Sequence, residues 1–394
     1  MNYILFDDAT RADLLPLVFM RPVADIRVGI LTIREKWEYL LKVKTSTMTE
    51  AYLAKKYPIV QAADNNVLIN GSVCPTQDMI QAVANLKVNE ALVTEDYIIA
   101  LNVGANVSGE VDIESGDNVL FDKPHIKIKN VQDIFGFNAE AIQSDFSMLT
   151  KGRSSQTLSD SNRVVGDRSL VFLEEGAKAE CATFNTTEGP IYIGKDAEVM
   201  ENASIRGPFA LGTSGVVKMA AKIYGGTTIG PWAKVAGEVN NSVIFGYSNK
   251  AHDGFLGNSV IAEWCNLGSD TNTSNLKNTY EEVRLWNYPT ASFVKTGLTF
   301  CGLIMADHSK CGINTMFNTG TVVGVSCNIY GSGFHRNFIS SFKWCSTAHV
   351  DEYDIEKAIS VAEIAYGRRQ KTFDEVEEAI FREVYAITRK NKLY

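Results

Sequence analysis

The stretch IGKDAEVMENASIRGPFALGTSGVVKMAAKIYGGTTIGPWAKVAGEVN, residues 193–240, repeats with a period of six. Each group of six begins with an aliphatic residue, and a second, mostly small residue follows four positions later. The aliphatic positions are Ile193, Val199, Ile205, Leu211, Val217, Ile223, Ile229 and Val235. The second positions are Ala197, Ala203, Phe209, Gly215, Ala221, Thr227, Ala233 and Val239.

A period of six fits neither an α-helix nor a plain β-strand and is typical of a hexapeptide β-helix. In that fold three hexads close one triangular coil, and the aliphatic side chains stack into a continuous core. The alternative is a β-sandwich of short strands, but nothing in a sandwich enforces a strict six. We therefore predict a parallel β-helix.

The repeat extends beyond residue 240 in a looser frame, through Ile244, Lys250, Leu256, Ile261 and Leu267. A polar interruption at 271–293 is long enough to leave the wall as a loop, which is where solenoids often bind ligands. Coil-like hexads resume at Ile304, and residues 351–370 and 373–390 are predicted to form two amphipathic helices.

Residues 1–165 lack the period of six and alternate strand-like and helix-like segments. We expect strands at 3–6 and 65–73, a helix at 28–43, a second helix beginning near Thr76 or Gln77, and one or two strands at 90–104. Residues 106–165 are polar and irregular. With 394 residues, two or three units are expected. The predicted organisation is an α/β domain at 1–165, a β-helix at 166–345 and C-terminal helices at 346–394.

Composition excludes several classes of protein. No apolar run approaches the roughly 20 residues of a membrane span, and the first residues lack the features of a signal peptide, so we expect a cytoplasmic protein without a membrane partner. A net charge of −8 argues against a nucleic-acid partner. The seven cysteines form no CxxC pair, which predicts reduced, mostly buried thiols.

Two histidines are candidates for chemistry. His252 lies between coils beside the predicted loop, and an imidazole is a suitable general base for an amine or hydroxyl that attacks a thioester. The alternative is a corner histidine bonded to backbone. His308 is a second candidate for ligand contact, and a corner role is an equal alternative. A zinc site would need three converging histidines, but no two of His252, His308 and His335 share a coil or lie on adjacent coils.

The segment Ser248-Asn249-Lys250-Ala251-His252, followed by Phe255, Leu256-Gly257, Asn266-Leu267-Gly268 and Asn275, resembles the acetyltransferase half of the GlmU family. The register holds without a gap from Glu238 to Asn275. The family's tyrosine is replaced by Phe255, and its phosphate-binding lysine by Asn240.

The resemblance implies a role for each matching residue. His252 is the catalytic base, and Asn275 orients it or the substrate amine. Phe255 and Asn266 contact the sugar, and Lys222 grips the sugar-linked phosphate. The acetyl-CoA region comprises Ser269, Gly302, Ala306 and Thr319.

The N-terminal part resembles the divergent GlmU-like proteins in which an Arg-Pro…Arg-x-Gly stretch replaces the Gly-rich phosphate loop. The resemblance makes Arg21, Arg27 and Lys36 candidates for binding the triphosphate, and solvated surface arginines around a structural turn are the alternative. Asn70 stands where the family has the aspartate that holds Mg²⁺. The substitutes that could hold the ion are Asp7, Asp8 and Asp133.

The resemblance further implies a left-handed coil, a homotrimer, and acetyl transfer from acetyl-CoA to the amine of glucosamine 1-phosphate or a related amino-sugar phosphate. The implied second activity joins the sugar phosphate to UTP, with Mg²⁺ as a candidate ion. Two alternatives stay open. One is an acyltransferase acting on another nucleotide-linked amino sugar, and the other is a sugar-nucleotide-binding β-helix without catalysis.

Overall fold

The computed structural model describes residues 1–105, 107 and 118–390 of the chain. Its contacts divide the chain into two compact units. The N-terminal unit comprises Met1–Leu14, Val18–Ile26 and Leu31–Lys129, and the coil unit comprises Leu15–Leu17, Arg27–Ile30 and Asn130–Tyr394. Each unit is described by itself.

The N-terminal unit is built on a six-stranded mixed sheet with the order β2-β1-β3-β5-β4-β6. β1 is parallel to both β2 and β3, whereas β5 is antiparallel to β3 and β4. The chain leaves β1 for β2 on one side and then returns to β3 on the other, so the crevice between β1 and β3 is a topological switch point. The strands are β1 (Asn2–Phe6), β2 (Ser46–Met48), β3 (Asn66–Asn70), β4 (Ala91–Val93), β5 (Ile98–Gly104) and β6 (Asn118–Leu120).

Two α-helices accompany this sheet, α1 (Ile33–Leu41) and α2 (Gln77–Ala84). The expected helix at 28–43 begins five residues later than predicted. The reason is a capping box, because the Thr32 side chain accepts from the Glu35 N–H and the Glu35 carboxylate accepts from the Thr32 N–H. The start of α2 is as predicted, since Thr76 caps it through the Met79 N–H.

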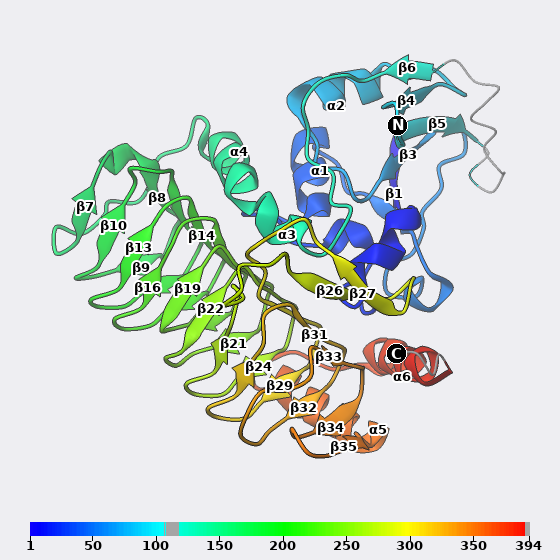
Figure 1. Ribbon diagram of the computed structural model, residues 1–394. Helices are drawn as coiled ribbons and strands as arrows, with labels where there is room; N and C mark the ends of the chain where they lie inside the picture. The colour runs from blue at the N-terminus through cyan, green and yellow to red at the C-terminus, as the bar shows by residue number, and fades with distance from the viewer. Residues whose placement is uncertain (106, 108–117, 391–394) are drawn as a thin grey trace. The chain divides into compact units, whose positions relative to one another are not determined.

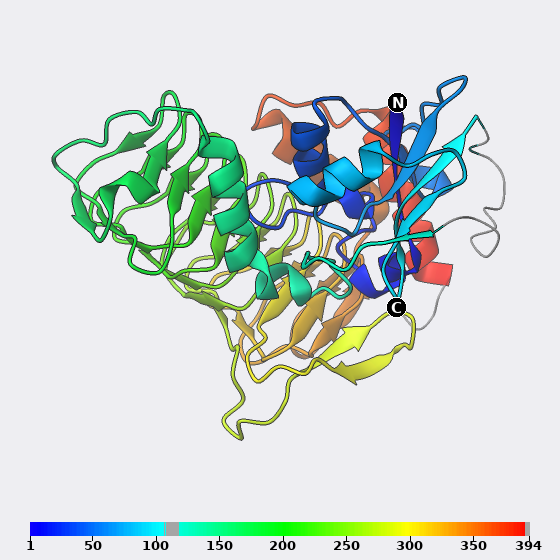
Figure 2. The ribbon, with the colours of Figure 1, turned by 90° about the horizontal axis from the view of Figure 1, so that it is seen from above.

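Residues 106–165 are not uniformly irregular, so that part of the prediction was wrong. Besides β6, the segment contains α3 (Asp133–Gly136) and α4 (Asn138–Thr150), while positions 106 and 108–117 lie outside the described residues. Interspersed polar residues hide the apolar face of α4, which is formed by Ala141, Ile142, Phe146 and Leu149. α4 contacts strands β14 and β17 of the coil (Figure 2).

The coil unit is the predicted parallel β-helix (Figure 1). Each coil contributes one strand to each of three faces in turn. The first face contains β7 (Arg163–Val165), β10 (Thr183–Asn185), β13 (Ser204–Arg206), β16 (Lys222–Ile223), β19 (Glu238–Asn240) and β22 (Phe255–Gly257), followed by β25 (Asn272–Thr273) and β30 (Met316–Phe317).

The second and third faces run parallel to the first along the coil. The second contains β8 (Val171–Leu173), β11 (Ile191–Ile193), β14 (Phe209–Leu211), β17 (Thr227–Ile229), β20 (Val243–Ile244), β23 (Val260–Ile261), β28 (Leu303–Met305), β31 (Thr321–Val323) and β33 (Phe338–Ile339). The third contains β9 (Lys178–Ala179), β12 (Glu198–Val199), β15 (Val216–Val217), β18 (Lys234–Val235), β21 (Asn249–Lys250), β24 (Asn266–Leu267), β29 (Lys310–Cys311), β32 (Asn328–Ile329), β34 (Lys343–Cys345) and the antiparallel β35 (Val350–Glu352).

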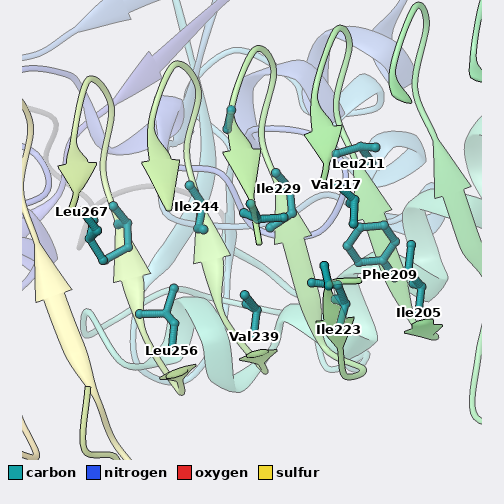
Figure 3. Close-up of a cluster of buried hydrophobic side chains, with 14 of the residues drawn as sticks. Ile205, Phe209, Leu211, Val217, Ile223, Ile229, Val239, Ile244, Leu256 and Leu267 are labelled. Carbon is teal, nitrogen blue, oxygen red and sulfur yellow. The ribbon is translucent and has the colours of Figure 1, made fainter. Parts of the chain in front are cut away.

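The residues of the period of six form the core of the coil. All eight predicted aliphatic side chains, from Ile193 to Val235, are 0–2% exposed and belong to one continuous cluster. In Figure 3, Ile205, Leu211, Val217, Ile223 and Ile229 can be followed from coil to coil. The looser frame also holds, because Ile244, Leu256, Ile261 and Leu267 continue the same cluster. In the hexads after 304 the second residue faces the core, as Met305, Cys311, Phe317, Val323 and Ile329 do.

The predicted insertion and tail are both present, but the insertion begins later than residue 271, because β25 still pairs with β30 in the coil wall. The insertion contains an antiparallel hairpin, β26 (Arg284–Asn287) and β27 (Ser292–Lys295), drawn in yellow in Figures 1 and 2. The tail forms α5 (Ile355–Gly367) and α6 (Glu375–Lys390), which contact each other. In the described part of the chain no helix has the length and apolar character needed to cross a membrane. All seven cysteines are free, and six are buried.

Candidate active sites

His252 lies on the corner that connects the third face to the first, between β21 and β22. Its side chain is exposed, and no described residue is hydrogen-bonded to it. Lys250 secures this corner from within the coil, because its Nζ donates to the His252 carbonyl at 2.7 Å and to the Ala236 carbonyl at 3.1 Å. The corner therefore presents an unobstructed imidazole on a fixed backbone.

Lys250 occupies a position that other coils fill with an aliphatic residue. Its Cα pairs with that of Val235 in the neighbouring coil, and the residue is 2% exposed. Burial lowers the pKa of its amine to about 8, since a charged ammonium is poorly solvated inside the coil.

Two predicted site residues, the substrate-binding Phe255 and the orienting Asn275, meet over Gly257 on the first face. A Cβ at Gly257 would lie 2.6 Å from both the Phe255 ring and the Asn275 amide nitrogen. Asn275 is itself held by its Nδ2, which donates to Asn258 Oδ1 at 2.8 Å. The missing side chain at Gly257 thus leaves the space in which an aromatic edge and an amide lie side by side.

Lys222 lies on the same face, two coils before this pair. The Cα of Lys222 pairs with that of Glu238, which in turn pairs with that of Phe255, so the three stand in register. Lys222 also borders a pocket of about 240 Å³. The pocket is lined by Thr183, Asn185, Ser204, Ile205, Arg206, Lys222, Ile223 and Tyr224.

The other predicted residues of the coil lie elsewhere. Asn266 is exposed on the third face, where its Cα pairs with that of Asn249. Gly302 and Ala306 are buried, and Thr319 is bonded to Ser274 through their hydroxyls at 2.7 Å. Ser269 is half-buried at a corner. Their contacts with substrate or acetyl-CoA remain predictions.

His308 is a corner residue packed among aromatic rings. Its φ is +62°, and its ring is parallel to those of Trp264 and Tyr366, with centroids 6.3 and 6.1 Å away. The edges of Phe373 and Phe381 complete the cluster. Within the described residues no three His, Cys, Asp or Glu side chains form a group that could hold a metal ion.

In the N-terminal unit, polar side chains gather where β1 and β3 end. Asn70 Nδ2 donates to Asp8 Oδ2 at 2.8 Å, and Lys127 Nζ donates to the same oxygen at 2.5 Å and to Ser72 Oγ at 2.7 Å. Burial alone would raise the pKa of Asp8, but the hydrogen bonds from Lys127, Thr10 and Asn70 outweigh it and hold the pKa below its ordinary value.

Lys127 and Ser72 were not predicted from the sequence. The signal available in the sequence was the position of Lys127 between two apolar residues, Ile126 and Ile128. In the structure all three residues are buried. A buried lysine needs a partner, and Asp8 supplies it.

The residues around Asn70 do not fit Mg²⁺. Asn70 directs its amide N–H to Asp8, and its Oδ1 already accepts from the Ser72 N–H and hydroxyl. Asp8 is paired with Lys127, and Asp7 accepts from Arg11, Thr49 and the Val23 N–H. Mg²⁺ is coordinated by oxygen atoms, usually of carboxylates, phosphates and water. Here hydrogen-bond donors already occupy the side-chain oxygens that would have to coordinate it. The third substitute, Asp133, accepts from the Asn130 N–H beside α3.

The predicted triphosphate residues are all buried. Arg21 and Lys36, which belong to the N-terminal unit, are 4% and 3% exposed. Arg27 belongs to the coil unit and donates to the Ile30 carbonyl. A role in nucleotide binding stays a prediction for each.

Comparison with known proteins shows which sequences and structures the chain is similar to. Residues 3–154 match the family model of sugar nucleotidyl transferases. The bifunctional protein GlmU of Methanocaldococcus jannaschii is 34% identical over 95 residues, which cover 24% of this chain and 22% of that protein. The resemblance to the GlmU-like family is confirmed. A second GlmU-like relative, the bifunctional sugar-1-phosphate nucleotidylyltransferase/acetyltransferase of Sulfurisphaera tokodaii, is 32% identical over 93 residues, 24% of this chain and 23% of that protein.

These matches cover less than a quarter of the length of either curated GlmU-like relative. Among solved structures, the UDP-N-acetylglucosamine acyltransferase of Arabidopsis is 15% identical with a TM-score of 0.22, covering 59% of this chain and 92% of that chain. The enzyme of the same name from Campylobacter jejuni is 15% identical with a TM-score of 0.17, covering 59% and 82%. The family match and the relatives support a transferase.

Proposed function

We propose that the chain is an acetyl-CoA-dependent N-acetyltransferase acting on glucosamine 1-phosphate or a related amino-sugar phosphate. Its N-terminal unit would join the sugar phosphate to UTP and release pyrophosphate. The observation that carries the first activity is the meeting of Phe255 and Asn275 over Gly257, directly after the exposed His252.

At the acetyl-transfer site, His252 accepts a proton from the sugar amine as the nitrogen attacks the thioester carbonyl. The C–N bond forms and the C–S bond breaks, and the coenzyme A thiolate leaves and takes up the proton from the imidazolium. General base catalysis by a positioned histidine contributes about 10²- to 10⁴-fold to rate. No covalent intermediate on the protein is required.

The first face supplies the groups that would orient the sugar. The Asn275 amide is held in place by Asn258 and offers a fixed polar contact, while the Phe255 ring offers an apolar edge. Lys222 lies in register with Phe255 along the coil axis, where a cation can attract the phosphate. Holding amine and thioester together in one geometry supplies much of the remaining rate.

For uridylyl transfer we assign the nucleotide site to the cluster of Asp8, Asn70, Ser72 and Lys127. Support comes from its place at the carboxyl ends of β1 and β3, since α/β sheets bind ligands at such switch points. No step is assigned to Mg²⁺. A homotrimer, implied by the GlmU-like resemblance, is part of the proposal and is checked by multi-angle light scattering.

The deciding experiment is a thiol-release assay with acetyl-CoA and glucosamine 1-phosphate. Release of coenzyme A that depends on the sugar phosphate supports the proposal. A panel of amino sugars linked to nucleotides, offered in the same assay, identifies a different acceptor if one is used. Absence of release with every amino sugar, from protein that still binds a sugar nucleotide, would contradict the enzymatic proposal and favour a binding protein.

A further inference from the structure

The last coil contains a second pocket, separate from the His252 corner. Its volume is about 250 Å³. It is lined by Trp286, His335, Arg336, Phe338, Ile339, Ser340, Lys343, Cys345, Ser346 and Val350. On the second face, strands β23, β28 and β31 separate β20, which belongs to the coil of His252, from β33 at this pocket. At about 4.8 Å per coil, the two places are well over a sugar's length apart.

Two residues that line the pocket each have a buried nitrogen atom without a partner in the described part of the chain. His335 is 3% exposed, and neither its Nε2 nor the Trp286 Nε1 has a hydrogen-bond partner among the residues that the structure describes. Buried polar atoms are nearly always bonded, so each exception requires an explanation. The indole N–H can only donate, and therefore its missing partner must be an acceptor.

The aromatic surroundings fix the direction of the Trp286 donor. The Trp286 ring stacks on the Phe338 ring with a centroid distance of 4.2 Å and an interplanar angle of 10°. The Phe293 edge packs against Trp286 at 5.4 Å from the other strand of the hairpin. The indole nitrogen is consequently held in place before any ligand arrives, which reduces the entropy lost on binding.

The charge of the pocket is positive. Arg336 and Lys343 belong to its wall, and no aspartate or glutamate does. Neither cation forms an ion pair within the described ranges 1–105, 107 and 118–390. Burial lowers the pKa of His335, which favours the neutral imidazole, and a neutral imidazole donates through one of its two nitrogens.

We propose that this pocket binds the phosphate group of a small molecule. Trp286 Nε1 and His335 Nε2 would each donate a hydrogen bond to phosphate oxygens, while Arg336 and Lys343 would neutralise the charge. Two donors and two cations exceed what the two oxygens of a carboxylate require, and they suit the larger number of phosphate oxygens. The site does not depend on the acetyl-transfer proposal.

The phosphate could be free or part of a larger cofactor, and titration calorimetry in Tris buffer distinguishes the two. One arm uses inorganic phosphate and the other uses coenzyme A. The test variants are Trp286→Phe, which removes the N–H while keeping a ring against Phe338, and Arg336→Gln, which alters an exposed side chain. Their controls are Trp232→Phe, at a tryptophan 42% exposed on another corner, and Arg163→Gln on β7, in the first coil.

We expect saturable one-site binding in at least one arm. Each test variant should weaken it tenfold or more, a difference of about 1.4 kcal/mol, while each control stays within about twofold of the parent protein. Binding of inorganic phosphate identifies a free phosphate, and binding of coenzyme A alone identifies a cofactor phosphate only where Trp286→Phe and Arg336→Gln weaken it, because the acetyl-transfer site also takes coenzyme A. Neither test variant touches the His252 corner.

Two results would overturn the proposal. One is the absence of saturable binding in both arms, and the other is binding that the test variants weaken no more than the controls. The pocket would then be only the open end of the coil beneath its last strands.

Discussion

The Gly29 N–H donates to Asn138 Oδ1 at 2.7 Å, which links two segments of the coil unit that are 109 residues apart. Asn138 Nδ2 donates onward to the Gly226 carbonyl at 2.7 Å, and Thr228 Oγ1 donates to the Gly29 carbonyl at 2.9 Å. Gly29 is therefore joined to the start of α4 and to the second face of the coil. The Arg-x-Gly stretch, residues 27–29, therefore helps to hold the coil unit together, independently of any ligand that Arg27 binds.

Gly29→Ala should destabilise the coil unit by more than about 2 kcal/mol. The φ of Gly29 is +76°, and a Cβ there would lie 2.5 Å from Asp145 Oδ2 and 2.9 Å from the Ala141 backbone. Gly152→Ala is the matched control, because its φ is +73° and nothing lies within 4 Å of the added carbon. Urea unfolding measures the free energy of unfolding of both variants. Equal losses of stability would contradict the importance of the close packing at Gly29.

His252→Ala should reduce acetyl transfer by about 10²- to 10⁴-fold, the contribution of a general base. The midpoint of thermal unfolding should hardly change, because the side chain is exposed and has no bonded partner among the described residues. His349→Ala, at another exposed histidine, is the control in the thiol-release assay. If both variants retain full activity, His252 is not the base.

Gly257→Ala should impair acetyl transfer more than it impairs folding. The added methyl group would displace the ends of two flexible side chains, the Phe255 ring and the Asn275 amide, each 2.6 Å from it. We expect KM for the sugar phosphate to rise by about tenfold with a stability loss of about 1–3 kcal/mol. An unchanged KM in steady-state assays would show that the sugar does not lie over Gly257.

Lys250→Met should stabilise the chain below about pH 8, and the gain should disappear toward pH 10.5. The Lys250 amine has a pKa of about 8 in the folded protein and 10.5 in the unfolded chain. Between pH 8 and 10.5 the unfolded state therefore binds more protons, and the stability of the parent protein rises with pH. The charged amine costs up to about 3 kcal/mol below pH 8, partly offset by its bonds to two carbonyls.

Urea unfolding of parent and Lys250→Met protein at pH 6.5, 8 and 9.5 tests this dependence. A stability difference that does not vary with pH would contradict it. The same variant should also lower acetyl transfer, since the bond from Lys250 Nζ to the His252 carbonyl is lost.

Lys127→Met should abolish uridylyl transfer and leave acetyl transfer intact. The variant removes the cation that contacts both Asp8 and Ser72 and leaves a buried carboxylate without its charge partner. Pyrophosphate release and thiol release, measured on the same preparation, separate the two activities. Loss of both activities would indicate general unfolding, which Lys129→Met, at a neighbouring exposed lysine, should not cause.

Most of the coil could be predicted because its determinants are local. Each inward position, such as Ile205 or Val217, is defined by its place in the hexad and needs no knowledge of distant residues. α4 was missed because its buried face is defined by contact with β14 and β17, which are distant in the chain. The late start of α1 depends on a side-chain cap at Thr32, which hydrophobic periodicity does not detect.

The candidate sites were predictable only in part. His252, Phe255 and Asn275 could be named from the GlmU-like resemblance, but the space over Gly257 that brings two of them together depends on the stacking of β22 and β25. Lys127 could not be placed beside Asp8, because 119 residues separate them and Lys127 reaches this place through an isolated bridge to Val73, just after β3. The packing of His308 was equally unpredictable, because besides Trp264 its aromatic neighbours come from α5, α6 and the connection between them.

The sequence by itself determined the parallel coil, its inward residues, its interruption and its helical tail. These follow from short-range periodicity, since burying one side chain per hexad is a condition that each coil meets alone or with its immediate neighbour. The tertiary structure alone decided the cluster of Asp8, Asn70 and Lys127, the anchoring of Gly29 by Asn138, and the pocket at Trp286 and His335. Those arrangements require hydrogen bonds and ring contacts between residues far apart in the chain, which no local pattern encodes.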